Sequence, residues 1–220
     1  MKLLLATASF DEIRWAATNG LLDGVMTTPA LLREAGVVDD REHVEGICEL
    51  TTAPVYVAVH AVDGQDIYRD ARELARVSDQ IIVQVPLVED AFSAMHRLHA
   101  DGVRIAAMLV FNAAQALLAA KAGATTVVTP LDQLDAVGHS GGEVVRELRR
   151  VFDASHTECD ILAVRPTTAQ QFSESALAGA DGVAISPDVL RSLLLHPLTD
   201  RGIDQFLNDV SKHHGGWNDQ

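Results

Sequence analysis

The sequence is poor in two residue types, cysteine and lysine. Its two cysteines, Cys48 and Cys159, lie far apart and form no CxxC pair. We therefore expect reduced thiols rather than a disulfide. Lysine occurs only as Lys2, Lys121 and Lys212, so arginine supplies the other side-chain cations.

Long apolar runs and linker segments are also missing. The longest apolar stretch, "RIAAMLVFNAAQALLAA", is interrupted by Asn112 and Gln115, which argues against a membrane-spanning helix. The opening "MKLLLATAS" soon meets Asp11 and Glu12, which is atypical of a secretory signal. No segment rich in proline, serine or charge divides the chain, so we expect one cytoplasmic domain over 1–220.

Positive charge is scarce in the chain as a whole. The formal net charge is −14 and the isoelectric point is about 4.9. Polyanionic surfaces repel such a protein, so we expect neither a nucleic-acid partner nor an anionic membrane partner.

What the sequence does contain is a regular alternation of short apolar runs and longer helical patterns. In "DAFSAMHRLHADG", for example, Phe92, Met95 and Leu98 recur at the spacing of one helix face. Three glycines follow such segments at the C-cap position: Gly102, Gly123 and Gly179. The eight apolar runs begin at Leu3, Gly24, Val55, Ile81, Arg104, Thr125, Asp160 and Gly182. Eight strand-helix units in 220 residues predict an α/β fold, a single (β/α)₈ TIM barrel.

In such a barrel the chemistry lies at the C-terminal ends of the strands. The residues expected there are Thr27, Thr28, His60, Gln84, Met108, Asn112, Asp132, Arg165 and Ser186. Polar groups at the mouth of an apolar barrel predict a pocket for a small polar ligand. The alternative role is capping of a helix N-terminus, which we favour for Asp90, Asn112, Thr168 and Ser186.

Several motifs together indicate a family. "DGVMTTPALL" resembles the "GVTTNPS" turn of the transaldolases, in particular the small branch that contains the fructose-6-phosphate aldolases. "VFNAAQALLAAKAGA" and "DAVGHSG" are similar to that family's "VFxxxQAxxAxxAGA" helix and "DxxGxSG" loop. The resemblance runs over essentially the whole chain and implies a TIM barrel that acts on ketose phosphates.

One departure from the family pattern concerns the nucleophile. The resemblance implies a lysine that forms a Schiff base with the substrate, in the motif "VKVP" on the strand that begins at Ile81. This chain reads "VQVP" there, so Gln84 takes the position of the lysine. An amide nitrogen is a very poor nucleophile because its lone pair is delocalised into the carbonyl. Neither Lys121 nor Lys212 is placed to replace the missing amine.

Further departures affect the other positions that the resemblance assigns to the aldolase site. The family's acid on the first strand is Ala6 here, its water-holding tyrosine is Pro130, and its phosphate-binding arginine is Gln133. The remaining changes at strand positions are Met26, Thr28, Ala58 and Met108. The barrel is therefore expected to persist without its aldolase chemistry.

Two residues, Arg165 and His60, could give the pocket a different chemistry. A guanidinium at Arg165 could bind a phosphate or carboxylate, or it could pair with Asp132 or Asp160. His60 could be a general acid or base, or a packed histidine that shares a strand face with Ala58. We expect Gln84, His60 and Asp132 to take part in any chemistry. We expect Thr27, Thr28, Met108, Gln133, Arg165 and Ser186 to contact the ligand.

The sequence leaves three functions open. The first is non-covalent acid/base chemistry on a small anionic, sugar-like ligand, the second a non-catalytic binding or interaction protein, and the third an ordinary aldolase or transaldolase. We expect no cofactor and no metal, because His96 and His99 on an outer helix lack a carboxylate cluster.

The expected layout is a barrel over about 1–197, a C-terminal helix over 198–212 and a polar tail over 213–220. In the family this helix packs on a neighbouring subunit. The resemblance therefore implies a homo-oligomer, a pentamer or decamer, formed through the segment around Phe206 and Val210.

Overall fold

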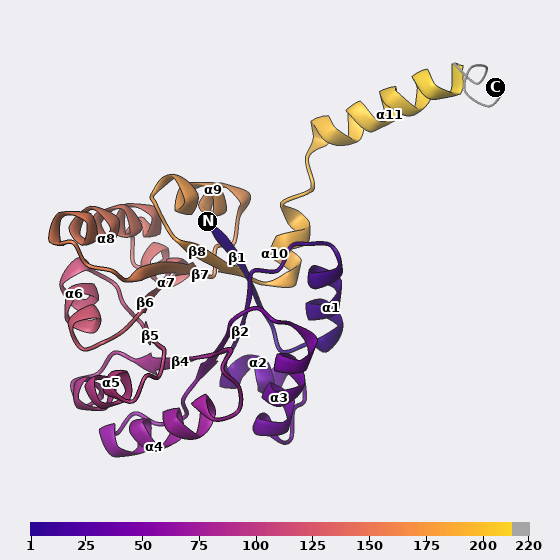
Figure 1. The fold of residues 1–220 in the computed structure, drawn as a ribbon. Helices are drawn as coiled ribbons and strands as arrows, with labels where there is room; N and C mark the ends of the chain where they lie inside the picture. Colours follow the sequence, from indigo (N-terminus) through magenta and orange to yellow (C-terminus); the bar gives the residue numbers. More distant parts are fainter. Residues whose placement is uncertain (213–220) are drawn as a thin grey trace.

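The computed structural model describes residues 1–212, and the expected polar tail 213–220 lies outside the described residues. Eight parallel strands pair in chain order and close into a barrel, because β8 also pairs with β1 (Figure 1). The strands are β1 (Lys2–Ala6), β2 (Gly24–Thr27), β3 (Val55–Ala58), β4 (Ile81–Pro86), β5 (Ile105–Met108), β6 (Thr126–Pro130), β7 (Asp160–Val164) and β8 (Gly182–Ile185). The predicted (β/α)₈ TIM barrel is confirmed.

Helices surround the barrel, and two of the connections contain two helices each (Figure 1). The helices are α1 (Phe10–Thr18), α2 (Pro29–Glu34), α3 (Asp40–Leu50), α4 (Gly64–Ala75), α5 (Ala91–Ala100), α6 (Ala113–Lys121), α7 (Leu131–Ala136), α8 (Gly141–Ser155), α9 (Ala169–Leu177), α10 (Pro187–Ser192) and α11 (Pro197–Lys212). Within residues 1–212, no helix combines the length and apolarity that crossing a membrane requires.

Side chains alternate between the two faces of each strand, which gives the protein two apolar layers. The outer layer lies between strands and helices and includes Met95 and Leu98 of α5, both fully buried. The inner layer fills the barrel and consists of Leu4, Met26, Tyr56, Ile82, Ala106, Val128, Leu162, Val164 and Ala184. Gln84 follows Ile82 by two residues on β4, so it belongs to the inward face of the barrel.

Most helix termini follow the sequence prediction. Asn112, Thr168 and Ser186 each accept a hydrogen bond from a backbone amide in the first turn, so their capping role is confirmed. Asp90 makes no side-chain capping bond and has helical backbone angles, so the capping prediction is wrong there. The three predicted C-cap glycines all have positive φ.

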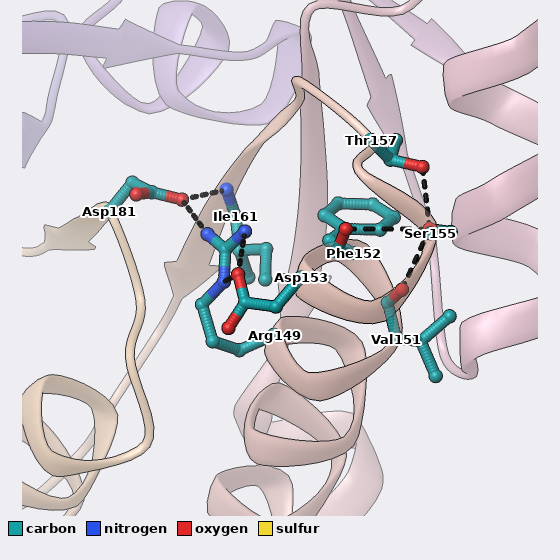
Figure 2. Close-up of polar contacts among 8 residues, drawn as sticks. All are labelled: Arg149, Val151, Phe152, Asp153, Ser155, Thr157, Ile161 and Asp181. Carbon is teal, nitrogen blue, oxygen red and sulfur yellow. Dashed lines mark hydrogen bonds and ion pairs between the residues drawn. The ribbon is translucent and has the colours of Figure 1, made fainter.

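A polar network joins the barrel to its longest surrounding helix, α8, near the N-terminal end of β7. Figure 2 shows the Asp181 carboxylate pointing at both the backbone amide of Ile161 and the guanidinium of Arg149. The distances are 2.7 Å to the Ile161 nitrogen and 3.3 Å to Arg149 Nη1. Arg149 also donates from Nε to Asp153 at 2.9 Å. One carboxylate thus connects β7, the start of β8 and α8.

The last helix, α11, departs from this compact arrangement. It extends away from the barrel after a short connection that follows α10 (Figure 1). None of its residues is buried, and Ile203, Phe206 and Leu207 are all more than half exposed. These three apolar side chains of α11 therefore face largely away from the protein core.

Candidate functional site

A cavity of about 450 Å³ lies at the C-terminal ends of the strands. This is within the size range of small-molecule pockets. Seven of the predicted residues line it: Thr28, Gln84, Met108, Asp132, Gln133, Arg165 and Ser186. The other lining residues are Ala6, Met26, Ala30, Leu31, Glu34, Leu109, Val128, Pro130, Val164, Pro166, Thr167, Ala184 and Val189. The strands and the loops after them thus bring residues from across the sequence into one pocket.

Gln84 is the polar side chain that β4 contributes to this cavity. It is only 2% exposed, and its Nε2 donates a 3.0 Å hydrogen bond to the backbone oxygen of Thr27 on β2. The residue beside it in register on β3 is Ala58, whose methyl group leaves room for the amide to reach across that strand. The amide is therefore held in a defined orientation by the barrel backbone.

Arg165 and Asp132 form an ion pair at the mouth of the cavity. Arg165 Nε donates to Asp132 Oδ1 at 2.9 Å, with the two side chains 50% and 35% exposed. The structure records no further hydrogen bond to this guanidinium within residues 1–212, which leaves its terminal nitrogens available to a ligand. The ion pair with Asp132 that the sequence allowed is thus present, and it does not use all of the donors of Arg165.

Two residues at this cavity have an unusual backbone conformation. Leu109 (φ 66°) and Arg165 (φ 59°) directly follow β5 and β7, and both lie in the left-handed region. For a residue with a Cβ this conformation costs roughly 1–2 kcal/mol. Strain of this kind gathers at functional sites, where the surrounding structure holds it in place. At Arg165, the residue with the strained backbone is also the residue whose guanidinium lies at the cavity mouth.

Two hydroxyl groups at the rim combine a structural role with a place in the cavity. Thr28 and Ser186 begin α2 and α10, and their oxygens accept from the amides of Leu31 and Val189, each at 3.3 Å. Both hydroxyls keep a proton that can be donated to a ligand.

The structure does not bring His60 and Thr27 into the cavity. His60 is exposed and lies 3.4 Å from Asp40, beside a separate cavity of about 220 Å³ between α3 and α4. The Thr27 side chain is fully buried, and its hydroxyl has no hydrogen-bond partner in the described residues. Thr27 contributes instead through its backbone oxygen, which holds the Gln84 amide.

Two other lining residues, Glu34 and Leu109, were not identified from the sequence. Glu34 is the last residue of α2, and Leu109 is the residue directly after β5. The position of Leu109 after a strand was a usable signal. No motif marked Glu34, which reaches the cavity because the short helix α2 lies at the barrel mouth.

No lysine lines the cavity, although all three lysines are among the described residues. Lys2 lies at the other end of the barrel, where it donates to Asp160 at 3.1 Å, and this bond raises the pKa of the ammonium group. Lys121 and Lys212 are the last residues of α6 and α11. None of the three lysines is therefore among the residues that line the cavity.

A metal centre is not formed by the side chains that the structure places. In the described part of the chain, no group of three or more histidine, cysteine, aspartate or glutamate residues is arranged to hold a metal ion. His96 and His99 are both exposed on α5.

The closed barrel with a ligand-sized cavity at the C-terminal ends of its strands defines a protein of the TIM-barrel class. The chain belongs to the transaldolase/fructose-6-phosphate aldolase family, whose model, described as "Transaldolase/Fructose-6-phosphate aldolase", matches residues 3–217.

Curated relatives agree with this assignment. A "Probable transaldolase" from Bartonella tribocorum is 40% identical over 212 residues, which cover 96% of this chain and 97% of the relative. Another from Petrotoga mobilis is 37% identical over 213 residues, covering 97% and 96%.

Solved structures of low sequence identity share the fold. A chain described as "Native KDPGal structure" matches with a TM-score of 0.58 and 16% identity, over 83% of this chain and 80% of that one. A thiamine phosphate pyrophosphorylase from Pyrococcus furiosus matches with a TM-score of 0.59 and 20% identity, over 87% and 93%.

Proposed function

We propose that this member of the family binds a small phosphorylated or carboxylated, sugar-like ligand without forming a Schiff base. In this proposal Gln84 stands where the family has its reactive lysine. The observation that carries the proposal is the cavity itself, which contains the Gln84 amide and no lysine. The non-covalent function follows from the chemistry of that amide.

A carboxamide cannot replace the lysine in carbon-carbon bond cleavage. The amine of a lysine forms an iminium whose positive charge accepts electrons from the breaking bond. The Gln84 amide is neutral, and one of its N–H groups already donates to Thr27. A single neutral hydrogen bond contributes far less than a full charge at the reacting carbon.

Arg165 supplies the charge that anchors the ligand in this proposal. Its terminal nitrogens can bind two oxygens of a carboxylate or phosphate side by side. Asp132, 2.9 Å away, holds the guanidinium in place and can accept a proton from a bound ligand. Such a site suits enolisation, isomerisation or dehydration. If no ligand is turned over, the same geometry serves a non-catalytic binding protein.

The names of the relatives favour a second candidate function, that of an ordinary transaldolase. "Probable transaldolase" describes proteins that are 37–40% identical over nearly the whole chain. This function needs a covalent intermediate on an amine of the enzyme. An ordinary transaldolase should therefore yield a trapped covalent adduct. The proposed non-covalent function predicts none.

Replacing Arg165 tests the proposed anchor. We expect Arg165→Ala to weaken anion binding at least about tenfold, because charge-assisted hydrogen bonds contribute roughly 1.5–3 kcal/mol each. Binding would be measured by thermal shift and then by calorimetry, with inorganic phosphate, gluconate and fructose 6-phosphate. The control is Arg69→Ala, which removes a 63% exposed arginine on outer helix α4. Equal anion binding by Arg165→Ala and Arg69→Ala would contradict the role of Arg165 as the anchor.

We also propose that the protein is a homo-oligomer, a pentamer or decamer, in which α11 packs on a neighbouring copy. The exposed apolar side chains of α11 support this, with Phe206 66% and Leu207 57% exposed. Burying apolar surface that is exposed to water is favourable. A second copy would supply the missing cover.

A cytoplasmic location is the remaining part of the proposal. Cys48 and Cys159 are both free thiols, as the sequence predicted, and unpaired cysteines are typical of a reducing compartment. The excess of negative charge supports the expectation that neither nucleic acid nor an anionic membrane is a partner.

A further inference from the structure

The depth of the cavity and its rim differ in chemistry. Among the lining residues that belong to strands, Gln84 alone is polar. The others carry only hydrocarbon or thioether side chains: Ala6, Met26, Met108, Val128, Pro130, Val164 and Ala184. A ligand that reaches the strands therefore enters an apolar chamber with one amide in its wall.

Four polar side chains of the cavity already make hydrogen bonds within the protein, which leaves each of them less capacity to bind a ligand. Thr28 and Ser186 accept from the first turns of their helices, and Thr167 bonds to Gln171 at 3.0 Å. Gln84 donates to Thr27. Apart from Gln133 and the charged groups, a polyhydroxylated ligand would thus find few uncommitted partners for its hydroxyls. Each hydroxyl buried without one weakens binding about tenfold.

The charges at the rim suit a ligand with a small negative charge. Arg165 is the single cation among the lining residues, while Asp132 and Glu34 are both acidic. Part of the Arg165 charge is balanced by Asp132. A phosphate dianion would need more positive charge than the cavity offers, whereas a planar monocarboxylate matches the free edge of one guanidinium.

From these three features we infer that the ligand is a small monocarboxylate with an apolar body, not a polyhydroxylated sugar phosphate. The carboxylate binds Arg165 at the rim. The apolar body fills the chamber beside Met26, Met108 and Val164. This inference rests on the proposed non-covalent binding through Arg165. It narrows the ligand of that site to the carboxylated class and replaces the sugar-like body by an apolar one.

Three six-carbon probes separate the possibilities by calorimetry on the full-length protein. 4-Methylpentanoate is an apolar monocarboxylate, gluconate has the same charge with many hydroxyls, and fructose 6-phosphate adds a phosphate. We expect 4-methylpentanoate to bind at least tenfold more tightly than gluconate or fructose 6-phosphate, and to lose that binding in Arg165→Ala.

The possible outcomes distinguish this inference from the function on which it rests. Arg165-dependent binding of gluconate or fructose 6-phosphate that equals or exceeds binding of 4-methylpentanoate would overturn the apolar ligand class and leave anion binding intact. If none of the three probes binds in an Arg165-dependent way, both the inference and the proposed anchor are contradicted.

A variant of the chamber wall provides a second test. Met108→Thr shortens one wall and adds a hydroxyl, and each apolar methylene that loses contact reduces affinity about fourfold. We expect the preference for 4-methylpentanoate over gluconate to fall at least fourfold. The control Leu118→Thr alters a 55% exposed residue on outer helix α6 and should leave the preference unchanged. An unchanged preference in Met108→Thr would count against the inference.

Discussion

At the scale of single residues, Gln84 sets the polarity of the deep part of the cavity. The sequence identified its strand and its position next to Val85 and Pro86, and the structure adds how the amide is held. Its hydrogen bond to the Thr27 backbone depends on the small side chain of Ala58 between them. No pattern in the sequence predicted this bond, because it joins residues that are 57 positions apart and lie on either side of β3.

The two cysteines differ in environment, and this predicts a difference in reactivity. Burial raises the pKa of the Cys159 thiol to about 12, and it also raises the pKa of Cys48. The thiolate is the reactive form, so at pH 8 very little of Cys159 is reactive. We expect iodoacetamide at pH 8 to label Cys48 first and Cys159 only after unfolding, as read by peptide mass spectrometry. If Cys159 were labelled faster than Cys48 in the folded protein, this would contradict the buried environment of Cys159.

At the scale of elements, periodicity and capping explain where strands and helices lie, but not how they are connected at the barrel ends. Met95 and Leu98 lie on the buried face of α5 as the spacing predicted, whereas Phe92 is only partly buried. Asp90 failed as a cap because its own backbone is helical, which sequence alone does not reveal. The network around Asp181 was likewise not foreseen, since its partners come from separate elements.

The Asp181 network predicts a measurable loss of stability. Asp181→Asn removes the charge that binds Arg149 and weakens the bond to the Ile161 amide, so we expect the free energy of unfolding to fall by roughly 1–3 kcal/mol. Urea denaturation would measure the change. The control Asp153→Asn removes only a 65% exposed partner of Arg149. We expect that control to cost less than about 1 kcal/mol. Similar losses in both variants would contradict the connecting role of Asp181.

Helix α11 leads to a prediction about assembly. If a neighbouring copy covers its apolar side, Phe206→Glu should weaken association at least about tenfold, because burying a phenylalanine contributes roughly 1.5–3 kcal/mol. Sedimentation velocity would report the change in mass. The control is Gln205→Glu, which adds the same charge on the opposite side of the helix. An assembly that both variants leave intact would show that α11 is not the contact.

At the scale of the whole molecule, the architecture could be predicted almost completely and the site only in part. Eight apolar runs separated by helical patterns are enough to define a closed barrel, since parallel strands must be covered by helices. Strand ends then located Thr28, Gln84, Met108, Asp132, Arg165 and Ser186 in one cavity, and the family resemblance added Gln133. His60 was expected there because it ends the third apolar run, but β3 ends at Ala58 and the chain after it places His60 beside Asp40.

The central claim is that this barrel works without a covalent amine intermediate. The most direct measurement incubates the native protein with fructose 6-phosphate or dihydroxyacetone, adds borohydride and determines the intact mass. The account predicts no stoichiometric adduct, because no lysine lines the cavity. A stoichiometric, ligand-dependent mass increase, mapped by peptide digestion to Lys2, Lys121 or Lys212, would contradict it.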